Sequence, residues 1–267
     1  MSGKKINVLG LGVMGTQISS LLRLMGWQVF AWNRNLREEH RTRHERAVRL
    51  MGRMMGFTQA PGEIVFVPEI KDLGKNLTIE NLPEDLNVKR EILNLLPYDW
   101  EGADLVTNSS SYEPREVHPK AHGLHFFNPL HVLKFIELAP GPSPLTPEGA
   151  ALVDSLRSAG FEIIEAYGNR GYIGNYILFH EIASALKLAE LHQYKSGTID
   201  RVLSHMGRST SLFDIIDMVG VDVTRSILIN LREKDPSIYV PPLLDLAVSK
   251  GILGKKNKTS IRTLTDA

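Results

Sequence analysis

Short apolar runs and longer segments with helical spacing follow one another through the first 165 residues of the chain. A short continuous apolar run is typical of a strand covered on both faces, whereas apolar positions three and four residues apart indicate a helix. The pattern predicts strands at residues 6–9, 28–32, 64–67, 77–80, 105–108 and 162–165, and helices at about 16–25, 36–55, 86–96 and 147–158. This alternation predicts an α/β fold, a doubly wound and mostly parallel sheet with helices on both faces.

Strand signals end near residues 168–171, where Gly168 and Gly171 interrupt the pattern. Beyond this point the apolar spacing is helical throughout. It predicts helices at residues 172–194, 199–206, 212–219, 223–231 and 243–250. The chain is therefore expected to form two domains, an N-terminal sheet domain over residues 1–168 and an all-helical C-terminal domain over residues 169–267.

A glycine-rich loop, GLGVMG at residues 10–15, joins the first predicted strand to the first predicted helix. In a strand–loop–helix–strand context this spacing indicates a Rossmann-type dinucleotide site. Gly10 permits the tight turn, Gly12 lets the backbone approach a pyrophosphate, and Gly15 lets helix and strand pack closely. With Val13 and Met14, which lie between the second and third glycines, these residues are the candidate cofactor-binding loop.

The second strand ends in Asn33 and Arg34, where NAD-binding folds usually carry an acidic residue for the ribose 2′-hydroxyl. A neutral side chain followed by an arginine tolerates a 2′-phosphate and offers it a charged partner. The cofactor is therefore expected to be NAD or NADP, with a lean to NADP.

Two further apolar runs flank a proline-containing loop and place a histidine and a carboxylate on neighbouring structure. His125 lies in the segment HFFNP at residues 125–129, and Glu137 lies in the run at residues 133–138. Histidine titrates near neutral pH, so it can take and return a proton, and a carboxylate can fix its tautomer. The alternative is a core histidine beside a surface glutamate, because ion pairs of this kind are also structural.

Composition narrows the function further. The chain has 267 residues, 43% of them hydrophobic, 31 basic and 30 acidic residues, and no cysteine. The balanced charge gives no electrostatic reason to bind nucleic acid or an anionic membrane, and the lack of cysteine excludes disulfides and a thiol nucleophile. The N-terminus shows no leader-like stretch, and no apolar run approaches the roughly 20 residues that span a bilayer. We expect a soluble cytoplasmic protein.

Several motifs together resemble those of the 3-hydroxyacyl-CoA dehydrogenase family. They are GLGVMG at 10–15, ENLPEDLNVK at 80–89, NSS at 108–110, HFFNP at 125–129 with Glu137, GYIGN at 171–175, SLFDIIDMVGVD at 211–222, YVPPLL at 239–244 and GILGKK at 251–256. The similarity covers nearly the whole chain, and the histidine segment with its glutamate is its most specific part. It implies an NAD(P)-dependent oxidoreductase that acts on a 3-hydroxyacyl thioester.

The resemblance also implies residue roles. His125 is the general base and Glu137 orients it, while Ser110 and Asn175 hydrogen-bond the reacting oxygen. Each of the last two also has a structural interpretation, as a turn residue or a helix cap.

Glu84 and Lys89 are implied to contact the cofactor near its ribose and nicotinamide. Ordinary exposed helix charges are the alternative for this pair.

This chain departs from the family in two segments besides the missing acidic residue. Residues 35–78 look shorter than the helical hairpin that contacts the CoA nucleotide, and residues 256–260 lack the glycine–aromatic ending. A shortened hairpin fits a thioester of CoA or of an acyl carrier protein, and also a small hydroxy acid. The differences suggest a divergent, biosynthetic member of fatty acid metabolism.

Two other functions remain open at this stage. One is a β-hydroxyacid dehydrogenase for small free acids, whose catalytic lysine would be Lys187. The other is a non-catalytic NAD(P)-binding protein. The histidine motif argues against the first, and the complete set of catalytic candidates argues against the second.

The remaining histidines and aromatic residues near the site are given smaller roles. We expect His118 and His122 to be loop residues and His131 to contact substrate through its loop, and no spacing suggests a metal site. Tyr172 and Phe127 are expected to pack rather than to take part in chemistry. The long apolar helix from residue 172 predicts a homodimer through the helical domain, which light scattering can test.

Overall fold

The computed structural model describes residues 4–58 and 61–266. The chain divides into two compact units, Met1–Tyr172 and Ile173–Ala267. The predicted boundary between residues 168 and 169 lies four residues before this division. The expectation about a leader-like stretch falls in part on residues 1–3, which lie outside the described residues.

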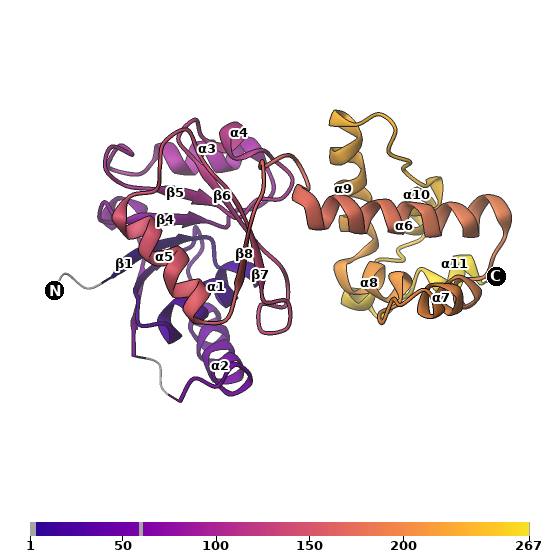
Figure 1. Ribbon diagram of the computed structural model, residues 1–267, viewed down its shortest axis with the longest axis horizontal. Coiled ribbons are helices and arrows are strands. Elements are labelled where there is room, and N and C mark those ends of the chain that lie inside the picture. The colour runs from indigo at the N-terminus through magenta and orange to yellow at the C-terminus, as the bar shows by residue number, and fades with distance from the viewer. Residues whose placement is uncertain (1–3, 59–60, 267) are drawn as a thin grey trace. The chain divides into compact units, whose positions relative to one another are not determined.

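The described part of the first unit forms one eight-stranded sheet with the order β3-β2-β1-β4-β5-β6-β7-β8. Figure 1 labels β1 and β4 to β8 of this sheet. The strands are β1 (Lys5–Leu9), β2 (Gln28–Trp32), β3 (Glu63–Val67), β4 (Leu77–Glu80), β5 (Leu105–Thr107), β6 (His122–Phe126), β7 (Phe135–Ala139) and β8 (Glu162–Glu165). The β6–β7 pair is antiparallel and every other neighbouring pair is parallel. The prediction of a doubly wound, mostly parallel sheet is confirmed.

Helices cover both faces of this sheet, which explains why its strands are continuous apolar runs. The helices of the unit are α1 (Val13–Leu24), α2 (Glu38–Met55), the 3₁₀ turn η1 (Ile70–Asp72), α3 (Leu86–Asn94), α4 (Pro114–Val117) and α5 (Pro147–Ser158). Side chains of α1, α2 and α5 share one core with Val8, and side chains of α3 and α4 share the other with Leu9. Successive strand residues point to opposite faces, so Val8 and Leu9 are both fully buried.

Local capping sets where two of these helices begin. The Asp85 side chain accepts hydrogen bonds from the backbone N–H groups of Asn87 and Val88 at the start of α3. The Thr146 side chain does the same for Gly149 at the start of α5. Such caps satisfy backbone donors that the first turn leaves without helical partners.

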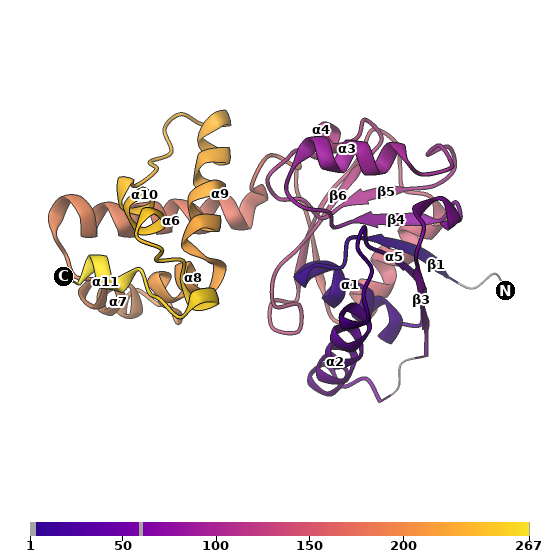
Figure 2. The same cartoon turned by 180° about the vertical axis from the view of Figure 1, so that it is seen from behind.

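The second unit consists of helices packed around α6, and the described residues 173–266 contain no strand (Figure 2). Its helices are α6 (Tyr172–His192), α7 (Ser196–His205), α8 (Leu212–Val219), α9 (Val221–Lys234), α10 (Pro242–Ser249), the 3₁₀ turn η2 (Lys255–Asn257) and α11 (Arg262–Thr265). Its core includes Phe179, Leu186, Phe213 and Leu228. The prediction of an all-helical C-terminal domain is confirmed.

The long helix α6 presents apolar side chains to solvent as well as to the core. Ile177, Leu188 and Leu191 are each at least 40% exposed. Their spacing places them near one stripe of the helix. Association of two copies through this stripe stays a prediction. No helix in the described ranges has both the length and the apolar character needed to cross a membrane.

Candidate active site

The glycine loop joins β1 to α1 at the carboxyl edge of the sheet. Gly10 has a positive φ of +87°, and a Cβ on it would lie 2.4 Å from the Asn81 carbonyl oxygen. A Cβ on Gly15 would lie 1.9 Å from the Gly10 carbonyl oxygen. These two positions therefore require glycine for close packing of the loop, the helix and the chain after β4.

Gly12 differs from its neighbours because the space beside it is open. Apart from its chain neighbours, no atom of the described residues lies within 4 Å of a Cβ built there. Gly12 is also the N-cap of α1, and no side chain among the described residues caps this end. An open backbone at an uncapped helix N-terminus fits the pyrophosphate of a dinucleotide, which Val13 and Met14 would face with their N–H groups.

The end of β2 braces this loop. The Asn33 side-chain oxygen accepts a hydrogen bond from the Leu11 N–H at 3.0 Å. The Arg34 guanidinium lies 3.3 Å from the Glu91 carboxylate, and both side chains are more than half exposed. An exposed pair of this kind contributes only about 0–1 kcal/mol, so Arg34 can exchange Glu91 for another anion at little cost.

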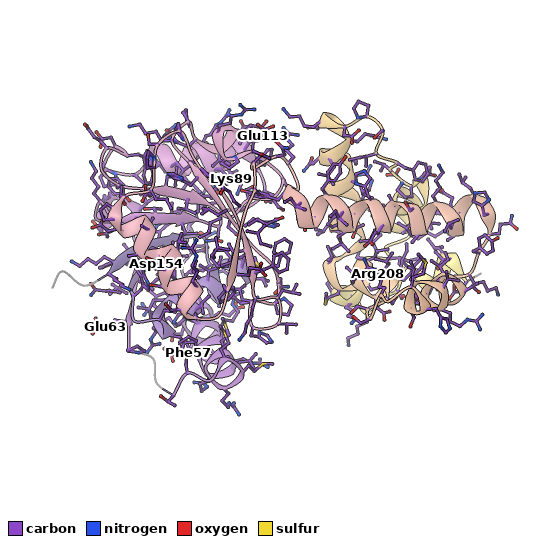
Figure 3. The ribbon with its side chains drawn as sticks, viewed as in Figure 1. Phe57, Glu63, Lys89, Glu113, Asp154 and Arg208 are labelled. Atoms are coloured by element: carbon purple, nitrogen blue, oxygen red, sulfur yellow. The ribbon has the colours of Figure 1, made fainter. Side chains whose placement is uncertain are left out.

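A buried ion pair lies between β4 and α3. The Lys89 ammonium, labelled in Figure 3, donates to the Glu80 carboxylate at 2.7 Å and to the Leu82 carbonyl at 3.1 Å, and lies 3.1 Å from the Glu84 carboxylate. The Lys89 and Glu80 side chains are 1% and 0% exposed. The interpretation of Lys89 as an exposed helix charge is therefore wrong. It failed because Lys89 lies on the face of α3 that packs on the sheet.

The other Glu80 contacts complete this network. Its carboxylate also accepts hydrogen bonds from the Leu82 N–H at 2.5 Å and the Thr107 hydroxyl at 2.6 Å. Burial alone would lower the pKa of Lys89, but the carboxylates of Glu80 and Glu84 hold this pKa above its ordinary value. Lys89 is thus charged at neutral pH, and the pair is stabilised by hydrogen bonds on both partners.

Glu84 carries the network to the end of β5. Its carboxylate accepts hydrogen bonds from the Ser109 hydroxyl at 2.8 Å and from the Ser110 N–H at 3.3 Å. Three of the predicted site residues, Glu84, Lys89 and Ser110, therefore meet in one hydrogen-bonded cluster. The Glu84 side chain is 43% exposed, whereas the Lys89 ammonium is occupied by protein oxygens. The contacts of this pair with a cofactor stay predictions.

His125 and Glu137 face each other across the antiparallel β6–β7 pair, where they are direct register partners. The His125 Nδ1 atom lies 2.8 Å from a Glu137 carboxylate oxygen, and the two residues are 5% and 1% exposed. A carboxylate only accepts hydrogen bonds, so the contact assigns the neutral ring's proton to Nδ1. The lone pair of the neutral ring is then on Nε2, as proton abstraction requires.

Aromatic rings enclose the His125 imidazole. Its centroid lies 4.4 Å from the Phe127 ring and 4.9 Å from the Tyr172 ring, and the latter is stacked with a 29° angle between planes. Tyr172 is 4% exposed. Burial, together with the carboxylates of Glu137 and Glu84, raises the pKa of Tyr172, so the phenol stays protonated. Both residues were expected to pack, and the structure shows that they pack on the candidate base itself.

Two amides that brace the histidine segment were given no site role by the sequence reasoning. The Asn108 side-chain oxygen accepts a hydrogen bond from the Phe126 N–H at 2.8 Å. Gln17 on α1 donates to the Asn128 side chain at 2.8 Å and accepts from the Leu130 N–H at 3.2 Å. Gln17 thus links the dinucleotide helix to the loop after His125. It has no motif signal, because its partners are more than 100 residues away in sequence.

His122 corrects one prediction. It is not a loop residue, because it begins β6 and is 3% exposed. Its Nδ1 atom accepts a hydrogen bond from the Gly141 N–H at 2.8 Å, and its Nε2 atom lies 3.7 Å from the buried Asp104 carboxylate. Burial lowers the pKa of His122, and Asp104 only partly offsets this effect. The error arose because glycine and histidine interrupt the apolar run before His125, which hides the start of the strand.

Two predicted residues lie on α6. Asn175 is half-buried in its first turn, and its predicted contact with the reacting oxygen stays a prediction. Lys187 is the lysine that a β-hydroxyacid dehydrogenase mechanism would require. Its ammonium lies over the Tyr239 ring, 5.3 Å from the ring centroid.

A cavity of about 420 Å³ opens beside the histidine loop. Its walls come from the start of α1, from α2 and from the loop after β6, and its lining combines five apolar residues with two arginines, a histidine, a threonine and a glutamine. The lining residues are Val13, Thr16, Gln17, Arg43, Arg46, Ala47, Leu50, Met51, Pro129 and His131. The structure therefore places His131 next to the candidate site.

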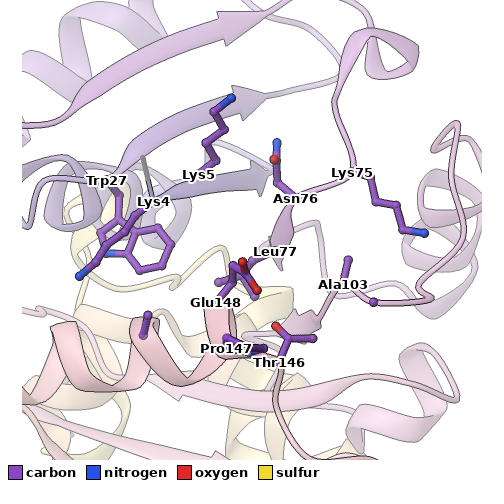
Figure 4. A pocket seen from close by; sticks show the side chains of 12 residues that line it. Lys4, Lys5, Trp27, Lys75, Asn76, Leu77, Ala103, Thr146, Pro147 and Glu148 are labelled. Carbon is purple, nitrogen blue, oxygen red and sulfur yellow. The ribbon is translucent and has the colours of Figure 1, made fainter. Parts of the chain in front are cut away.

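A second cavity, of about 410 Å³, lies at the opposite, amino edge of the sheet (Figure 4). Lys4 and Lys75 are among its lining residues, and they already contact Ser155 and Asp99. Ligands of open parallel sheets bind outside the carboxyl ends of the strands. The cavity beside His131, and not this one, is the candidate substrate site.

Comparison with known families agrees with this geometry. Residues 5–164 match the family model described as 3-hydroxyacyl-CoA dehydrogenase, NAD binding domain. Residues 171–263 match the model of the C-terminal domain of the same family. The two matches correspond to the sheet unit and the helical unit.

Individual relatives are distant. The chain is 28% identical over 192 residues to the mitochondrial hydroxyacyl-coenzyme A dehydrogenase of Rattus norvegicus, a match that covers 68% of this chain and 61% of the rat protein. It is 28% identical to a 3-hydroxybutyryl-CoA dehydrogenase of Mycobacterium tuberculosis, over 95% of this chain and 96% of that protein.

Solved structures share the fold over the whole chain. The crystal structure of FadB2 from M. tuberculosis is 26% identical, has a TM-score of 0.84, and matches 98% of this chain and 99% of its own. The (S)-3-hydroxybutyryl-CoA dehydrogenase PaaH1 from Ralstonia eutropha, at 19% identity and a TM-score of 0.81, matches 97% of this chain and 98% of its own and shares the fold.

The buried pair generates a stability prediction. Lys89→Met leaves the Glu80 charge without its buried partner, so we expect the free energy of unfolding at pH 7 to fall by about 3–5 kcal/mol. Because the pKa of Lys89 is raised in the fold, the wild-type contribution is fully present at pH 7 and is lost only as the pH rises through this raised pKa. Urea unfolding measures the loss.

The control is the double variant Glu80→Gln/Lys89→Met, which removes both charges. It should lose less stability than Lys89→Met alone. A loss below about 1 kcal/mol for Lys89→Met would contradict the description of a buried ion pair.

Proposed function

Because the chain belongs to the 3-hydroxyacyl-CoA dehydrogenase family, we propose that it transfers a hydride between a nicotinamide dinucleotide and the 3-hydroxy or 3-oxo group of an acyl thioester. The observation that carries the proposal is the 2.8 Å contact between His125 Nδ1 and Glu137, beside an open glycine loop. A general acid–base pair next to a dinucleotide site is what alcohol oxidation and ketone reduction require.

His125 acts as the base in the oxidising direction. Its Nε2 atom takes the proton of the 3-hydroxyl group, and the ring becomes an imidazolium whose Nδ1–H is held by Glu137. In the reducing direction the same proton returns to the carbonyl oxygen. The bound nicotinamide supplies the hydride acceptor or donor.

Other residues of the chain position the reacting groups. Ser110 is proposed to hydrogen-bond the reacting oxygen, and Glu84, whose side chain is 43% exposed, to contact the cofactor near its ribose. Lys89 acts through Glu84, because its ammonium is already bound by protein oxygens. Phe127 and Tyr172 exclude water from the imidazole, which strengthens its interaction with Glu137.

The cofactor preference follows from the end of β2. The chain offers Asn33 and Arg34 where an acidic residue would select the ribose 2′-hydroxyl. Asn33 is committed to the glycine loop, whereas Arg34 makes only an exposed pair with Glu91. An arginine that can exchange its partner suits a 2′-phosphate, so we propose a preference for NADP over NAD.

The cavity beside His131 supports a thioester carrier that bears phosphate. Arg43 and Arg46 line its α2 wall, and Arg43 has only a loose 3.5 Å contact with the exposed Glu39. The apolar part of the lining, Val13, Ala47, Leu50, Met51 and Pro129, suits the pantetheine arm and a short acyl chain. Coenzyme A and the phosphopantetheine group of an acyl carrier protein both combine these features, and a small free hydroxy acid does not.

The catalytic pair is tested by variants assayed with acetoacetyl-CoA. We expect His125→Gln to lower kcat by about 10²–10⁴ and Glu137→Gln to lower it on the order of 100-fold, because proton transfer and ring orientation are lost. Both variants should still bind the dinucleotide, which can be measured by the change in tryptophan fluorescence. A folded His125→Gln enzyme that binds cofactor and keeps full turnover would refute the assignment.

The same assay, run on the wild type with NADPH and with NADH, tests the cofactor preference. NADPH should give the higher kcat/KM, and a higher value for NADH would contradict the role given to Arg34. Cofactor binding without turnover on thioesters of CoA and of carrier protein would favour a non-catalytic protein.

The carrier proposal has a separate test. In Arg43→Ala/Arg46→Ala we expect KM for acetoacetyl-CoA to rise about tenfold or more, because charge-assisted contacts with phosphate are lost, with little change in kcat. The thioester acetoacetyl-N-acetylcysteamine has no phosphate, so its kinetics should not change. Arg49→Ala is the control, because Arg49 is an exposed arginine of α2 outside the cavity lining. Equal losses on both thioesters would contradict the proposal.

A further inference from the structure

The ring of Tyr172 stacks on the imidazole of His125, and we propose that Tyr172 is a positioning residue for proton transfer. It holds the His125 ring in place and stabilises the charged imidazolium through its aromatic face. The catalytic part of this inference rests on the proposed function, in which His125 is the base. The stabilisation of the charged His125 ring by Tyr172 is independent of that function and can be measured without turnover.

The geometry around His125 leaves the ring little freedom. Glu137 holds the Nδ1 atom at the ring edge, while Tyr172 lies against the ring face at a centroid distance of 4.9 Å and an angle of 29°. Phe127 contacts the same ring at 4.4 Å and is itself stacked on Phe135 at 4.2 Å. Tyr172 therefore acts at a different part of the ring from the carboxylate.

The backbone of Tyr172 is held in a conformation that a tyrosine rarely adopts. Its φ is +48°, which lies in the left-handed region. Two hydrogen bonds fix this turn, from the Tyr172 N–H to the Asn169 carbonyl and from the Gly171 N–H to the Ser110 carbonyl. Unusual backbone conformations of this kind persist where the surroundings require them, often at functional sites.

A glycine in the strand that carries His125 leaves room for the Tyr172 side chain. Gly123 lies two residues before His125 on β6, and a Cβ on it would be 1.9 Å from the Tyr172 hydroxyl oxygen. That hydroxyl is buried and has no hydrogen-bond partner among the described residues. A buried hydroxyl without a partner lowers stability, so the hydroxyl does not explain why a tyrosine is held here. The contact that Tyr172 makes with His125 is through the face of its ring.

The stack matters most when the ring is charged. A cation over an aromatic face is attracted by the ring quadrupole, and the attraction is stronger in a desolvated site. In the oxidising direction the imidazolium forms only as the proton is transferred, so the interaction stabilises the transition state more than the ground state. The charged or titratable groups near the stack are Glu137 on β7 and Glu84 in the loop before α3.

The first experiment compares Tyr172→Leu and Tyr172→Phe by the kinetics of 3-hydroxybutyryl-CoA oxidation, the direction in which His125 must begin unprotonated. Leucine removes the aromatic face, so kcat should fall about tenfold, and the acid limb of the kcat pH profile should move to lower pH by about one unit, with KM changed less. Phenylalanine keeps the face, so its kcat and pH profile should stay close to wild type. Tyr167→Leu is the control, because Tyr167 is 99% exposed and precedes the same turn.

The second experiment needs no turnover. The ring signals of His125 are identified in the NMR spectrum by their loss in His125→Gln, and they are titrated in each variant without substrate. The titration midpoint should fall by about one pH unit in Tyr172→Leu and stay unchanged in Tyr172→Phe. An unchanged midpoint in a folded Tyr172→Leu protein would overturn the proposal, whereas the predicted shift without turnover in any variant would refute only the proposed function.

The variant Gly123→Ala tests the stacking contact without replacing Tyr172. The added methyl group would displace the Tyr172 ring, so the variant should reproduce the loss seen with leucine. Combining it with Tyr172→Phe removes the hydroxyl at 1.9 Å and leaves the Pro114 Cγ atom at 2.9 Å and the nearest ring carbon at 3.0 Å, so the double variant should regain part of the lost activity and move the midpoint part of the way back to the wild-type value. A folded Gly123→Ala protein with the wild-type midpoint would contradict the proposal.

Discussion

The hydrogen bond between His125 and Glu137 depends on the antiparallel pairing of β6 with β7. Every other neighbouring pair in the sheet is parallel. Reversing the chain after β6 makes His125 and Glu137 direct neighbours although they are 12 residues apart in sequence. Side chains at directly opposed positions of an antiparallel pair lie on the same face within contact distance. The topology of the sheet therefore brings His125 and Glu137 into contact.

Hydrogen-bonded polar groups, some buried and some partly exposed, connect this pair to the dinucleotide loop. Gln17 joins α1 to the segment after His125, and Asn108 joins the end of β5 to Phe126. The Glu80–Lys89 pair fixes the loop after β4, and Glu84 extends it to Ser109 and Ser110. Such networks are costly to bury unless their members are hydrogen-bonded, and once satisfied they make a site rigid. A rigid site keeps hydride and proton transfer aligned.

Much of this arrangement could be predicted from the sequence. Continuous apolar runs gave the bounds of β2, β4 and β8 to the residue, and the glycine loop and the HFFNP segment gave two of the site's components. The sequence could not show that Lys89 is buried, because one lysine on a charged helix looks the same whether its partner is Glu80 or water. It also could not show that Tyr172 packs on His125, since the contact depends on a positive φ and on the space left by Gly123. The very short helices α4 and α11 carry too few residues to show a period.

The central claim is that Glu137 holds the neutral His125 ring with its proton on Nδ1, so that Nε2 is free to act as the base. The most direct measurement is the ¹⁵N–¹H correlation spectrum of the histidine rings at a pH where His125 is neutral, with its signals identified by their loss in His125→Gln. The account predicts a protonated Nδ1 and an unprotonated Nε2, and loss of this preference in Glu137→Gln. A ring with its proton on Nε2, or one whose tautomer is the same without the carboxylate, would contradict it.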